Sequence, residues 1–469
     1  MKILAIIAVI FAFLLGSKIY IYRRVLRYSV FFVNHRKLLI LALSALFAAE
    51  IGFWLLAKDT RFNAVSYSLL GSCVAITYCL FAACVVADVA GIFVRAFRKL
   101  TRRIRAMQTQ NPHKMSSPIS KQTSAQEHGL DSNALDSGSS VSPAAMSSQC
   151  GTDFCAAIAP NATKVSSRFS PGRRRFLKIL HDLGIFMLFF LFFFTSRNAA
   201  LHTPPLRHVQ IPLPRLREQK RIALISDVHI GHTLKGDFLA RIVEQINTLD
   251  ADIVVIVGDL VDDYIDRIAH EFAALDSIKS KEGVFYVNGN HEYYHDIESI
   301  MRFLRQTSVR VLANESIELS GFNLAGVNDL AGLRFGMEAP DLKRAKQNLN
   351  PAKPSILLAH QPKFSRRYDV SDFDLVLSGH THAGQVFPMS VFVWLDQRYV
   401  HGLYTLDENP QNLHDKSPQD KRFKDSPAQA KPPKSKETKL YVSSGAGFWG
   451  PSFRFLAPSE IVCIDLLPA

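Results

Sequence analysis

Two stretches, Leu224-Ile-Ser-Asp-Val-His229 and Val257-Gly-Asp-Leu260, decide how this chain is expected to fold. Each belongs to a run of apolar, largely β-branched residues typical of a buried strand, and each reaches a carboxylate where the strand would stop. Asp227 and His229 are separated by a single residue, so on an extended backbone their side chains point the same way. The glycine of the second stretch would let the backbone turn tightly, so that its aspartate faces the same place. We therefore expect oxygen and imidazole ligands to meet at the carboxyl edge of an α/β sheet.

Three later segments repeat this pattern of an apolar run followed by polar residues. They are Gly289-Asn-His-Glu292, His360 and Gly379-His-Thr-His382. A lone histidine or a single His-x-His pair is a weak signal, since most such residues are structural or lie at the surface. Five strand ends that each finish in Asp, Asn or His together indicate a metal site. No serine nucleophile elbow, Cys-His arrangement or Walker-type loop competes with this interpretation.

The complete set resembles the calcineurin-like metallophosphoesterase superfamily, whose pattern is D-x-H, G-D, G-N-H-D/E, a lone His and G-H-x-H. The resemblance runs from about Arg221 to the last residue of the chain. Three segments are similar to the membrane-associated bacterial branch, which also includes a transmembrane animal relative: Gly379-His-Thr-His-Ala-Gly-Gln385, Gly402-Leu-Tyr404 and Tyr441-Val-Ser-Ser-Gly445. The resemblance implies an α/β fold, the αββα sandwich of the superfamily, preceded here by an N-terminal transmembrane helical region.

The resemblance also implies a role for each residue of the set. One metal would be held by Asp227, His229 and His382, the second by Asn290, His360 and His380, and Asp259 would bridge the two. Carboxylate, amide and imidazole ligands without thiolates suit Mn²⁺, Fe or Zn²⁺, with Mn²⁺ favoured. His291, which follows ligand Asn290, is the candidate general acid, and Asp262 is the candidate that orients it. Asp263 is an alternative to Asp262, and Glu292 is a candidate outer partner.

Other residues near these motifs have weaker assignments. His232 and His295 are expected to be rim or surface residues rather than ligands. Phe448-Trp-Gly-Pro451 and Phe453 follow the expected strand Leu440–Ser443. Their aromatic surface would either line a groove facing lipid or pack in the core.

The implied function is that of a membrane-anchored, dimetal phosphoesterase. It would hydrolyse a phosphodiester, pyrophosphate or phosphomonoester with a metal-activated water, on a lipid-linked or envelope substrate. Some members of the branch are linked to UDP-2,3-diacylglucosamine hydrolysis in lipid A synthesis, which is the alternative substrate. A non-catalytic membrane scaffold or sensor is the alternative of another class, although the complete ligand set argues against it. A transporter-like role for the first spans rests only on Glu50 and Asp88.

Charge separates a membrane protein from a nucleic-acid-binding protein here. The chain has 469 residues, a formal net charge of +14 and an isoelectric point near 9.5. Much of the basic excess flanks apolar stretches in the first part of the chain, as in membrane proteins. Aromatic and basic residues do not interleave as they do on a nucleic-acid platform, so the membrane and a phosphate ester are the expected partners.

Composition divides the chain into five segments. We expect a transmembrane region with about three helices at 1–106, a disordered polar linker at 107–172, a transmembrane or signal-anchor helix at 173–200, a Pro-rich connector at 201–220, and the metallophosphoesterase domain at 221–469. The apolar stretches approach the length that a bilayer requires. The linker and an insertion within the domain at about 406–438 are polar and lack hydrophobic periodicity.

Basic residues predict the orientation of the membrane segments. The Lys18–Lys37 loop, Arg95–Arg105 and Arg173–Lys178 are all basic and are expected to stay in the cytoplasm. The protein would then cross a bacterial inner membrane several times, with its catalytic domain on the periplasmic or outer face. Arg173–Lys178 also matches the twin-arginine export pattern R-R-x-F-L-K, and a simple basic flank on a stop-transfer helix is the alternative.

Overall fold

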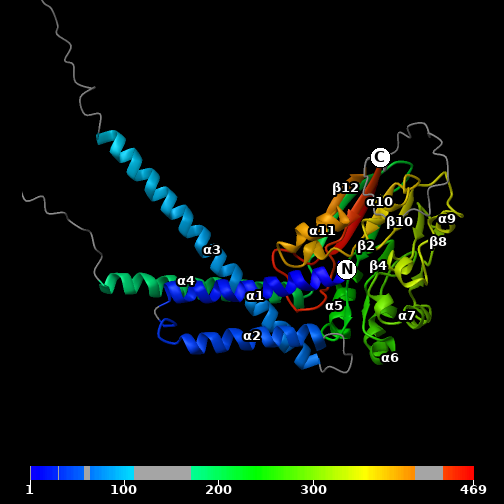
Figure 1. Ribbon diagram of the computed structural model, residues 1–469. Helices are drawn as coiled ribbons and strands as arrows, with labels where there is room; N and C mark the ends of the chain where they lie inside the picture. The colour runs from blue at the N-terminus through cyan, green and yellow to red at the C-terminus, as the bar shows by residue number, and fades with distance from the viewer. Residues whose placement is uncertain (1, 30, 57–63, 110–170, 407–436) are drawn as a thin grey trace, which may run out of the picture. The chain divides into compact units, whose positions relative to one another are not determined.

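The computed structural model describes residues 2–29, 31–56, 64–109, 171–406 and 437–469 (Figure 1). The expected linker therefore lies outside the described residues over 110–170, and the expected insertion lies outside them over 407–436. Contacts group the chain into two compact units. One joins Met1–Val86 to Ile179–Ala469, and the other is Ala87–Lys178.

The N-terminal region is helical. Its helices are α1 (Lys2–Tyr28), α2 (Arg36–Leu56), α3 (Ala64–Thr109) and α4 (Pro171–Leu201). Among the described residues, three helical segments are long and apolar enough to cross a membrane: Arg36–Leu56, Ala64–Arg105 and Arg175–Leu201. They correspond to the later three of the four expected stretches, and α1 is not among them.

Glu50 of α2 faces neighbouring helices. Its carboxylate is fully buried and pairs with the ammonium of Lys18 from α1. The same ammonium donates to Thr77 Oγ1 of α3 at 3.2 Å. A buried carboxylate is stable only with such partners. Glu50 thus has the structural environment of a helix-packing residue.

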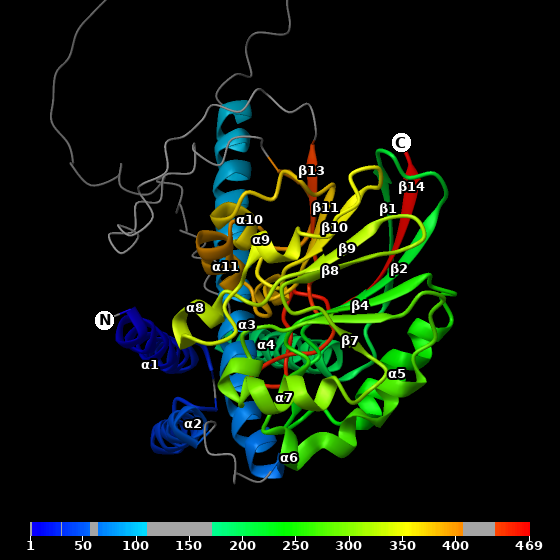
Figure 2. The same ribbon diagram turned by 90° about the vertical axis from the view of Figure 1, so that its right-hand side faces the viewer.

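The domain expected at 221–469 contains, among its described residues and together with β1, two six-stranded sheets (Figure 2). The first has the order β1 (Leu206–Leu213), β14 (Ile461–Pro468), β2 (Lys220–Ile225), β4 (Ile253–Val257), β6 (Val284–Val287) and β7 (Arg310–Val311). The second has the order β12 (Gly402–Leu406), β13 (Thr438–Val442), β11 (Leu375–Ser378), β10 (Ser355–Leu358), β9 (Asn323–Gly326) and β8 (Glu315–Glu318). A two-stranded piece joins β3 (Ile230–Gly231) to β5 (Val261–Asp262).

The site-bearing strands are parallel within each sheet. β2 pairs with β4 and β4 with β6, and in the second sheet β9, β10 and β11 run parallel. Each sheet therefore presents several strand carboxyl ends at one edge. This shared edge is where the loops that follow β2, β4, β6, β10 and β11 meet.

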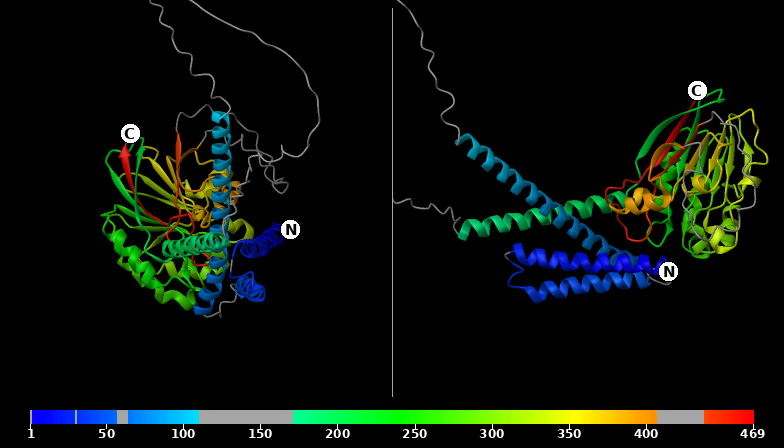
Figure 3. Two further views of the ribbon diagram at one scale, coloured as in Figure 1. Left: turned by 90° about the vertical axis from the view of Figure 1, so that its left-hand side faces the viewer. Right: turned by 45° about the horizontal axis from the view of Figure 1, so that its top comes forward.

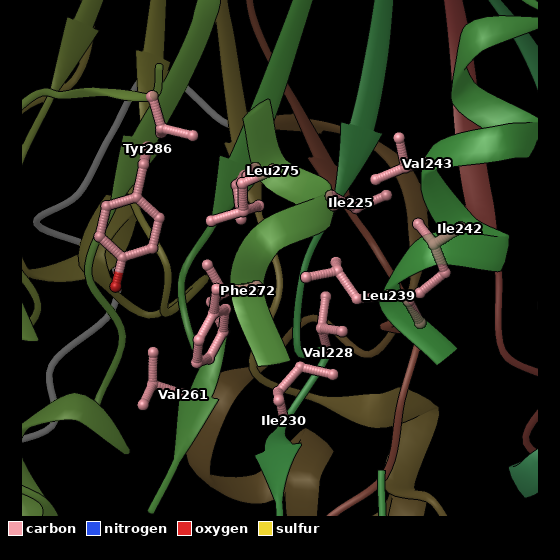
Figure 4. Packing of buried hydrophobic residues seen from close by; sticks show 14 of the residues in the cluster. Ile225, Val228, Ile230, Leu239, Ile242, Val243, Val261, Phe272, Leu275 and Tyr286 are labelled. Atoms are coloured by element: carbon pink, nitrogen blue, oxygen red, sulfur yellow. The ribbon is translucent and has the colours of Figure 1, made fainter. Parts of the chain in front are cut away.

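Three apolar clusters build the layers. The first fills the space between the sheets, with Leu224 and Val255 of one sheet and Leu358 and Leu377 of the other fully buried. The second covers the outer face of the first sheet with α5 (Gly236–Asn247), α6 (Ile265–Ile268), the 3-10 helix Ala269–Ser277 and α7 (Ile297–Leu304). Figure 4 shows part of this cluster, with Leu239 of α5 and Phe272 of the 3-10 helix. The third covers the second sheet with α9 (Leu342–Ala345) and α10 (Phe364–Arg367). The expected αββα sandwich is thereby confirmed.

Two segments differ from their expected conformation. The Pro-rich stretch 201–220 contains edge strand β1, in which Ile211 and Leu213 point into the core between the sheets. An edge strand tolerates Pro212 because its missing N–H can lie on the unpaired side. The spacing of apolar residues over Ile268–Ile278 predicts an α-helix, but Ala269–Ser277 form a 3-10 helix.

Candidate metal centre

The loops at the shared carboxyl edge hold the predicted residues in an unusual backbone conformation. Asp227, His229 and Asp259 have φ angles of 55°, 52° and 50°. These values lie in the left-handed region, which residues other than glycine rarely adopt and which concentrates at functional sites. Asp227 and His229 reach the same place through this turn, and not by the strand alternation expected from their spacing.

Asp227, His229 and His382 form the first candidate metal group. One ligand atom from each lies within 4.8 Å of the others, and all three residues are buried. His382 Nε2 is 3.3 Å from Asp227 Oδ1, and the Nε2 atoms of His229 and His382 are 3.0 Å apart. Two imidazole nitrogens and a carboxylate that converge in this way fit a divalent transition metal.

Asp259, His360 and His380 form the second candidate group. His360 donates its Nδ1–H to the carbonyl oxygen of Val257 at 2.8 Å, which fixes the tautomer and leaves Nε2 as an acceptor. That Nε2 lies 3.1 Å from Asp259 Oδ2 and has no hydrogen-bond donor among the described residues. Buried Asn290 Oδ1 likewise has no donor among the described residues. Buried acceptors without donors are expected where a cation binds.

Asp259 belongs to both neighbourhoods. Its Oδ2 is 3.9 Å from His229 Nε2 of the first group and 3.1 Å from His360 Nε2 of the second. The two groups are also joined through the backbone, because His380 N–H donates to both carboxylate oxygens of Asp227 at 2.9 and 3.0 Å. The structure thus brings together six of the seven predicted ligands in two adjoining clusters, with Asn290 buried nearby.

Two glycines permit this close packing. A Cβ on Gly258, whose φ is 76°, would lie 2.4 Å from His360 Nδ1. A Cβ on Gly289 would lie 2.2 Å from Asp259 Oδ1. Both distances are far below van der Waals contact, so each G-D and G-N-H motif needs its glycine for space as well as for turning.

His291 contacts Asp262 and not Asp263. Its Nδ1 is 2.7 Å from Asp262 Oδ1, while the Asp263 carboxylate accepts the N–H of Tyr264 at 2.7 Å. The backbone N–H of His291 also donates to Asp259 Oδ1 at 2.8 Å. The candidate acid is therefore tied to the carboxylate that lies between the two clusters.

Charge and burial compete at this pair. Burial opposes protonation of His291, but the carboxylates of Asp262 and Asp259 outweigh it and raise the pKa of the imidazole to about 9. Burial favours a neutral Asp262, but the neighbouring His291 and His229 outweigh it and hold the pKa of that carboxyl well below its usual range. The pair is thus arranged as imidazolium and carboxylate.

With this geometry in place, comparison with known proteins identifies the domain. Residues 220–384 match the calcineurin-like phosphoesterase family. The chain is 43% identical over 291 residues to an uncharacterized metallophosphoesterase of Campylobacter jejuni, covering 62% of this chain and 70% of that protein. This chain belongs to the metallophosphoesterase family. It is therefore a metal-dependent hydrolase of phosphoric esters, with candidate sites for divalent metals.

Two further proteins are similar to this metallophosphoesterase. A transmembrane protein with metallophosphoesterase domain from Danio rerio is 33% identical over 287 residues, covering 58% of this chain and 59% of that protein. A UDP-2,3-diacylglucosamine pyrophosphatase of Chlamydia trachomatis is 26% identical over 303 residues, covering 53% of this chain and 83% of that protein. The apolar helices and the transmembrane relative indicate that this metallophosphoesterase is a membrane protein.

Glu292, expected only as an outer partner of the site, makes hydrogen bonds to two of the loops that carry proposed metal ligands. It begins the 3-10 helix Glu292–Tyr294 and is fully buried. Its carboxylate accepts the backbone N–H groups of Asp259, Leu260, Val261 and Gly289, at 3.2, 2.7, 3.0 and 2.7 Å. One side chain therefore holds the two loops that carry Asp259 and Asn290.

Arg454 is a site residue that the sequence does not reveal. It is 1% exposed, and its guanidinium donates to the carbonyl oxygens of His382, Ser444 and Gly447 at 2.9, 2.6 and 2.6 Å. Burial lowers its pKa to about 10, so the side chain stays cationic. Its partners are backbone atoms, which leave no residue pattern that sequence reading could detect.

The rim of the site includes a residue from the membrane region. The ring of Tyr67, in the first turns of α3, stacks on His232 with centroids 5.1 Å apart and an interplanar angle of 16°. Both rings line a small cavity together with His229 and Asp262. His232 thus lies at the rim of this cavity, and its stacking partner comes from a segment expected only to span the membrane.

The aromatic segment after β13 divides between the two predicted environments. Phe448 and Phe453 are buried, whereas the Trp449 side chain is exposed and its ring lies 6.3 Å from that of His291. The backbone of Trp449 is held by Gln385, which donates to its carbonyl at 2.9 Å and accepts its N–H at 3.2 Å. Phe448 lines the small cavity beside His229 and Asp262, and Trp449 is the exposed ring of the three.

Proposed function

We propose that this metallophosphoesterase uses two divalent metals, with Mn²⁺ favoured, to hydrolyse a phosphodiester, pyrophosphate or phosphomonoester carried by a membrane. The proposed ligands are Asp227, His229 and His382 for one metal, Asn290, His360 and His380 for the other, and Asp259 as the bridge. The observation that carries the proposal is the position of Asp259 between two clusters of buried side chains that can ligate a metal. A scaffold would not need loops that combine a left-handed backbone conformation with several possible metal ligands.

The residues of the chain supply proton transfer and positioning. When bound, the metals would supply Lewis-acid activation of a water and of the phosphoryl oxygens. His291 donates a proton from Nε2 to the departing oxygen of the substrate, since its Nδ1 is engaged by Asp262. Asp262 fixes the orientation of that ring and favours its protonated form. Trp449 narrows the approach beside His291.

Metal analysis of the full chain in detergent tests the proposal. We expect close to two equivalents of metal and hydrolysis of bis(4-nitrophenyl) phosphate that a chelator abolishes and Mn²⁺ restores. Full metal occupancy without hydrolysis of any phosphate ester in a panel of nucleotides, phospholipids and UDP-linked lipids would favour the scaffold or sensor instead.

A membrane-borne substrate is the finer part of the proposal. It is supported by the three described helices that are apolar enough to span a bilayer and by the transmembrane relative. Detergent extracts of membranes, incubated with the Mn²⁺-loaded chain and then examined for loss of phosphorus-containing lipids, would reveal such a substrate. Hydrolysis confined to water-soluble esters would argue against it.

UDP-2,3-diacylglucosamine hydrolysis in lipid A synthesis is the second candidate activity. Its support is the similarity to the Chlamydia trachomatis pyrophosphatase. This substrate is a cytoplasmic precursor, so the candidate requires a catalytic domain on the cytoplasmic side. The two activities are therefore separated by membrane topology.

We infer that the catalytic domain lies on the periplasmic or outer face of a bacterial inner membrane. Arg36 begins α2, and Arg95–Arg105 lie in α3 beyond its apolar part. If both stay in the cytoplasm, α4 runs outward from its basic start at Arg173–Lys178. The outward direction of α4 follows from the cytoplasmic position of these basic residues, whether or not α1 spans the membrane.

Reporter fusions after Leu206 test this orientation. Alkaline phosphatase, active only outside, should give a signal, and a fluorescent protein that matures only inside should stay dark. A fluorescent fusion with an inactive phosphatase would overturn this orientation. UDP-2,3-diacylglucosamine would then become the favoured substrate. Replacing Arg173 and Arg174 by Lys in the same fusion tests the export-signal alternative, because twin-arginine transport depends on those two residues.

A further inference from the structure

Helix α11 (Met389–Gln397) exposes most of its apolar side chains. It lies at the periphery of the catalytic domain, drawn in orange (Figure 3). Phe392 and Leu395 are 53% and 62% exposed, and Val391, Met389 and Trp394 are also exposed. Of the large exposed hydrophobic residues in the described part of 202–469, six of fourteen fall between Phe387 and Leu395. This clustering distinguishes the helix from a surface with scattered apolar residues.

Two polar residues of α11 contact Lys363 of the domain. Gln397, the buried residue of the helix, accepts the N–H of Lys363 at 3.2 Å. Asp396 pairs with the ammonium of Lys363 at 3.0 Å. The helix therefore lacks the inward apolar face of a usual surface helix, since its one fully buried residue is a glutamine. Such a surface requires an apolar partner outside the domain.

The exposed surface continues toward the membrane helices of the same compact unit. Val386, just before α11, forms a bridge with Phe455 and belongs to a buried cluster with it. That cluster packs against Val74 and Tyr78 of α3 and Phe192 and Phe193 of α4. Both helices are candidate membrane spans. The exposed apolar surface of α11 is therefore continuous with the parts of α3 and α4 that contact the domain. If these helices span a bilayer, this surface would contact the same bilayer.

We propose that α11, together with Phe387 and Leu456, is a membrane-docking surface that lies in the interface of the bilayer holding α2, α3 and α4. Leu456, 75% exposed, follows directly after Phe455. The occupant is lipid rather than protein because the aromatic and basic chemistry is that of a membrane interface. Arg398 lies 4.4 Å from the centroid of the Trp394 ring, and this pairing suits the boundary between acyl chains and phosphate headgroups.

Docking of α11 would set the position of the candidate metal centre. The helix follows the 3-10 turn His382–Gly384, which carries a proposed metal ligand. Gln385, at the end of that turn, is bonded to Trp449 beside His291. A movement of α11 at the membrane would therefore be transmitted through Gln385 to Trp449, which lies beside His291. This consequence for substrate access rests on the proposed function, whereas the docking itself does not.

Fluorescence of Trp394 in lipid bilayers tests the docking without any substrate. The chain has three tryptophans, so W54F and W449F in the full chain leave Trp394 as the single reporter. In vesicles of phosphatidylethanolamine and phosphatidylglycerol with brominated acyl chains, we expect blue-shifted Trp394 emission with a large loss of intensity relative to unbrominated vesicles. Emission typical of water, unquenched by bromine and quenched by aqueous iodide, would overturn the proposal.

A matched pair of variants makes the assignment specific. In the same single-tryptophan background, F392S with L395S should remove most of the bromine quenching, because it removes apolar area that would enter the bilayer. Leu403→Ser on β12, also at an exposed apolar residue, is the control and should leave the quenching unchanged. If the double variant does not fold, the bromine quenching of Trp394 in the single-tryptophan parent still shows whether α11 contacts the acyl chains. A dimer in detergent that only the double variant dissociates, without bromine quenching, would assign the surface to a second copy and contradict the proposal.

Discussion

His291 and Asp262 are 29 residues apart in the chain, yet His291 Nδ1 lies 2.7 Å from Asp262 Oδ1. The contact engages one nitrogen of the imidazole and leaves the other to face outward from the pair. It also places a buried carboxylate where it favours a protonated ring. This geometry is what a general acid requires, and it leads to two separate predictions.

The first prediction concerns the proton donor itself. His291→Ala should slow hydrolysis of an alkyl or phenyl phosphate ester by about 10²–10⁴, because the departing oxygen then leaves without a proton. A 4-nitrophenyl ester should lose much less, since its leaving group is stable as an anion. Rates for esters of graded leaving-group acidity measure this difference. His270→Ala, at an exposed imidazole, is the control, and an equal loss for every ester would exclude the acid role.

The second prediction concerns the pH dependence of the rate. The protonated form of His291 is fully present at low pH and is lost as pH rises through its pKa, which the neighbouring carboxylates raise to about 9. Asp262→Asn removes the largest of the interactions that raise this pKa. The alkaline limb of kcat for poor leaving groups should therefore move to lower pH. Asp263→Asn should leave the limb in place, and a limb that does not move in Asp262→Asn would contradict the assignment.

The third prediction concerns the bridging carboxylate. Asp259→Asn should lower the metal content of the purified chain and reduce activity more than loss of any single histidine ligand, because this carboxylate belongs to the second group and also faces His229 of the first. Metal analysis and initial rates measure the two effects. Asp266→Asn, at an exposed carboxylate outside the site, should retain both. Wild-type metal content and rate in Asp259→Asn would remove the basis of the proposed bridge.

The fold could be predicted from sequence because its signals are local. The apolar runs that end in Asp227, Asp259 and His360 are short, bounded and rich in β-branched residues, and they form β2, β4 and β10 as expected. Helical spacing at Ile297–Leu304 gives α7 with the same limits. The resemblance then supplied the arrangement of the two sheets, which no single segment encodes.

The finer geometry could not be predicted because it depends on contacts distant in sequence. The spacing of Asp227 and His229 indicated strand alternation, but the left-handed turn that positions them is stabilised by neighbours such as Gly258, whose carbonyl accepts the N–H of Asp227 at 3.0 Å. The choice between Asp262 and Asp263 required coordinates. Tyr67 gave no signal at all, since an aromatic residue at the start of an apolar helix is usual at a membrane interface.

The fourth prediction concerns the carboxylate that joins the loops of Asp259 and Asn290. Glu292→Gln keeps the shape of the side chain but turns an NH₂ group toward backbone N–H donors, so at least one buried donor loses its acceptor. Each such loss costs about 1–3 kcal/mol, and the melting temperature of the detergent-solubilised chain should fall. Glu298→Gln, at an exposed site in α7, should melt like the parent. An unchanged melting temperature in Glu292→Gln would show that the four contacts contribute little.

The last prediction concerns Arg454, whose guanidinium connects the turn of His382 to the loop after β13. Arg454→Met fills similar space but leaves the carbonyl oxygens of Ser444 and Gly447 without a donor in a buried place. We expect a lower melting temperature together with a lower metal content, because His382 loses the contact that orients its backbone. Arg454→Lys keeps the charge but cannot reach the same number of carbonyls, so its losses should be intermediate. Arg207→Met, at a half-exposed arginine of β1, controls for the loss of a cation. If Arg454→Met melts at a lower temperature but binds metal like the parent, Arg454 stabilises the domain without shaping the metal centre.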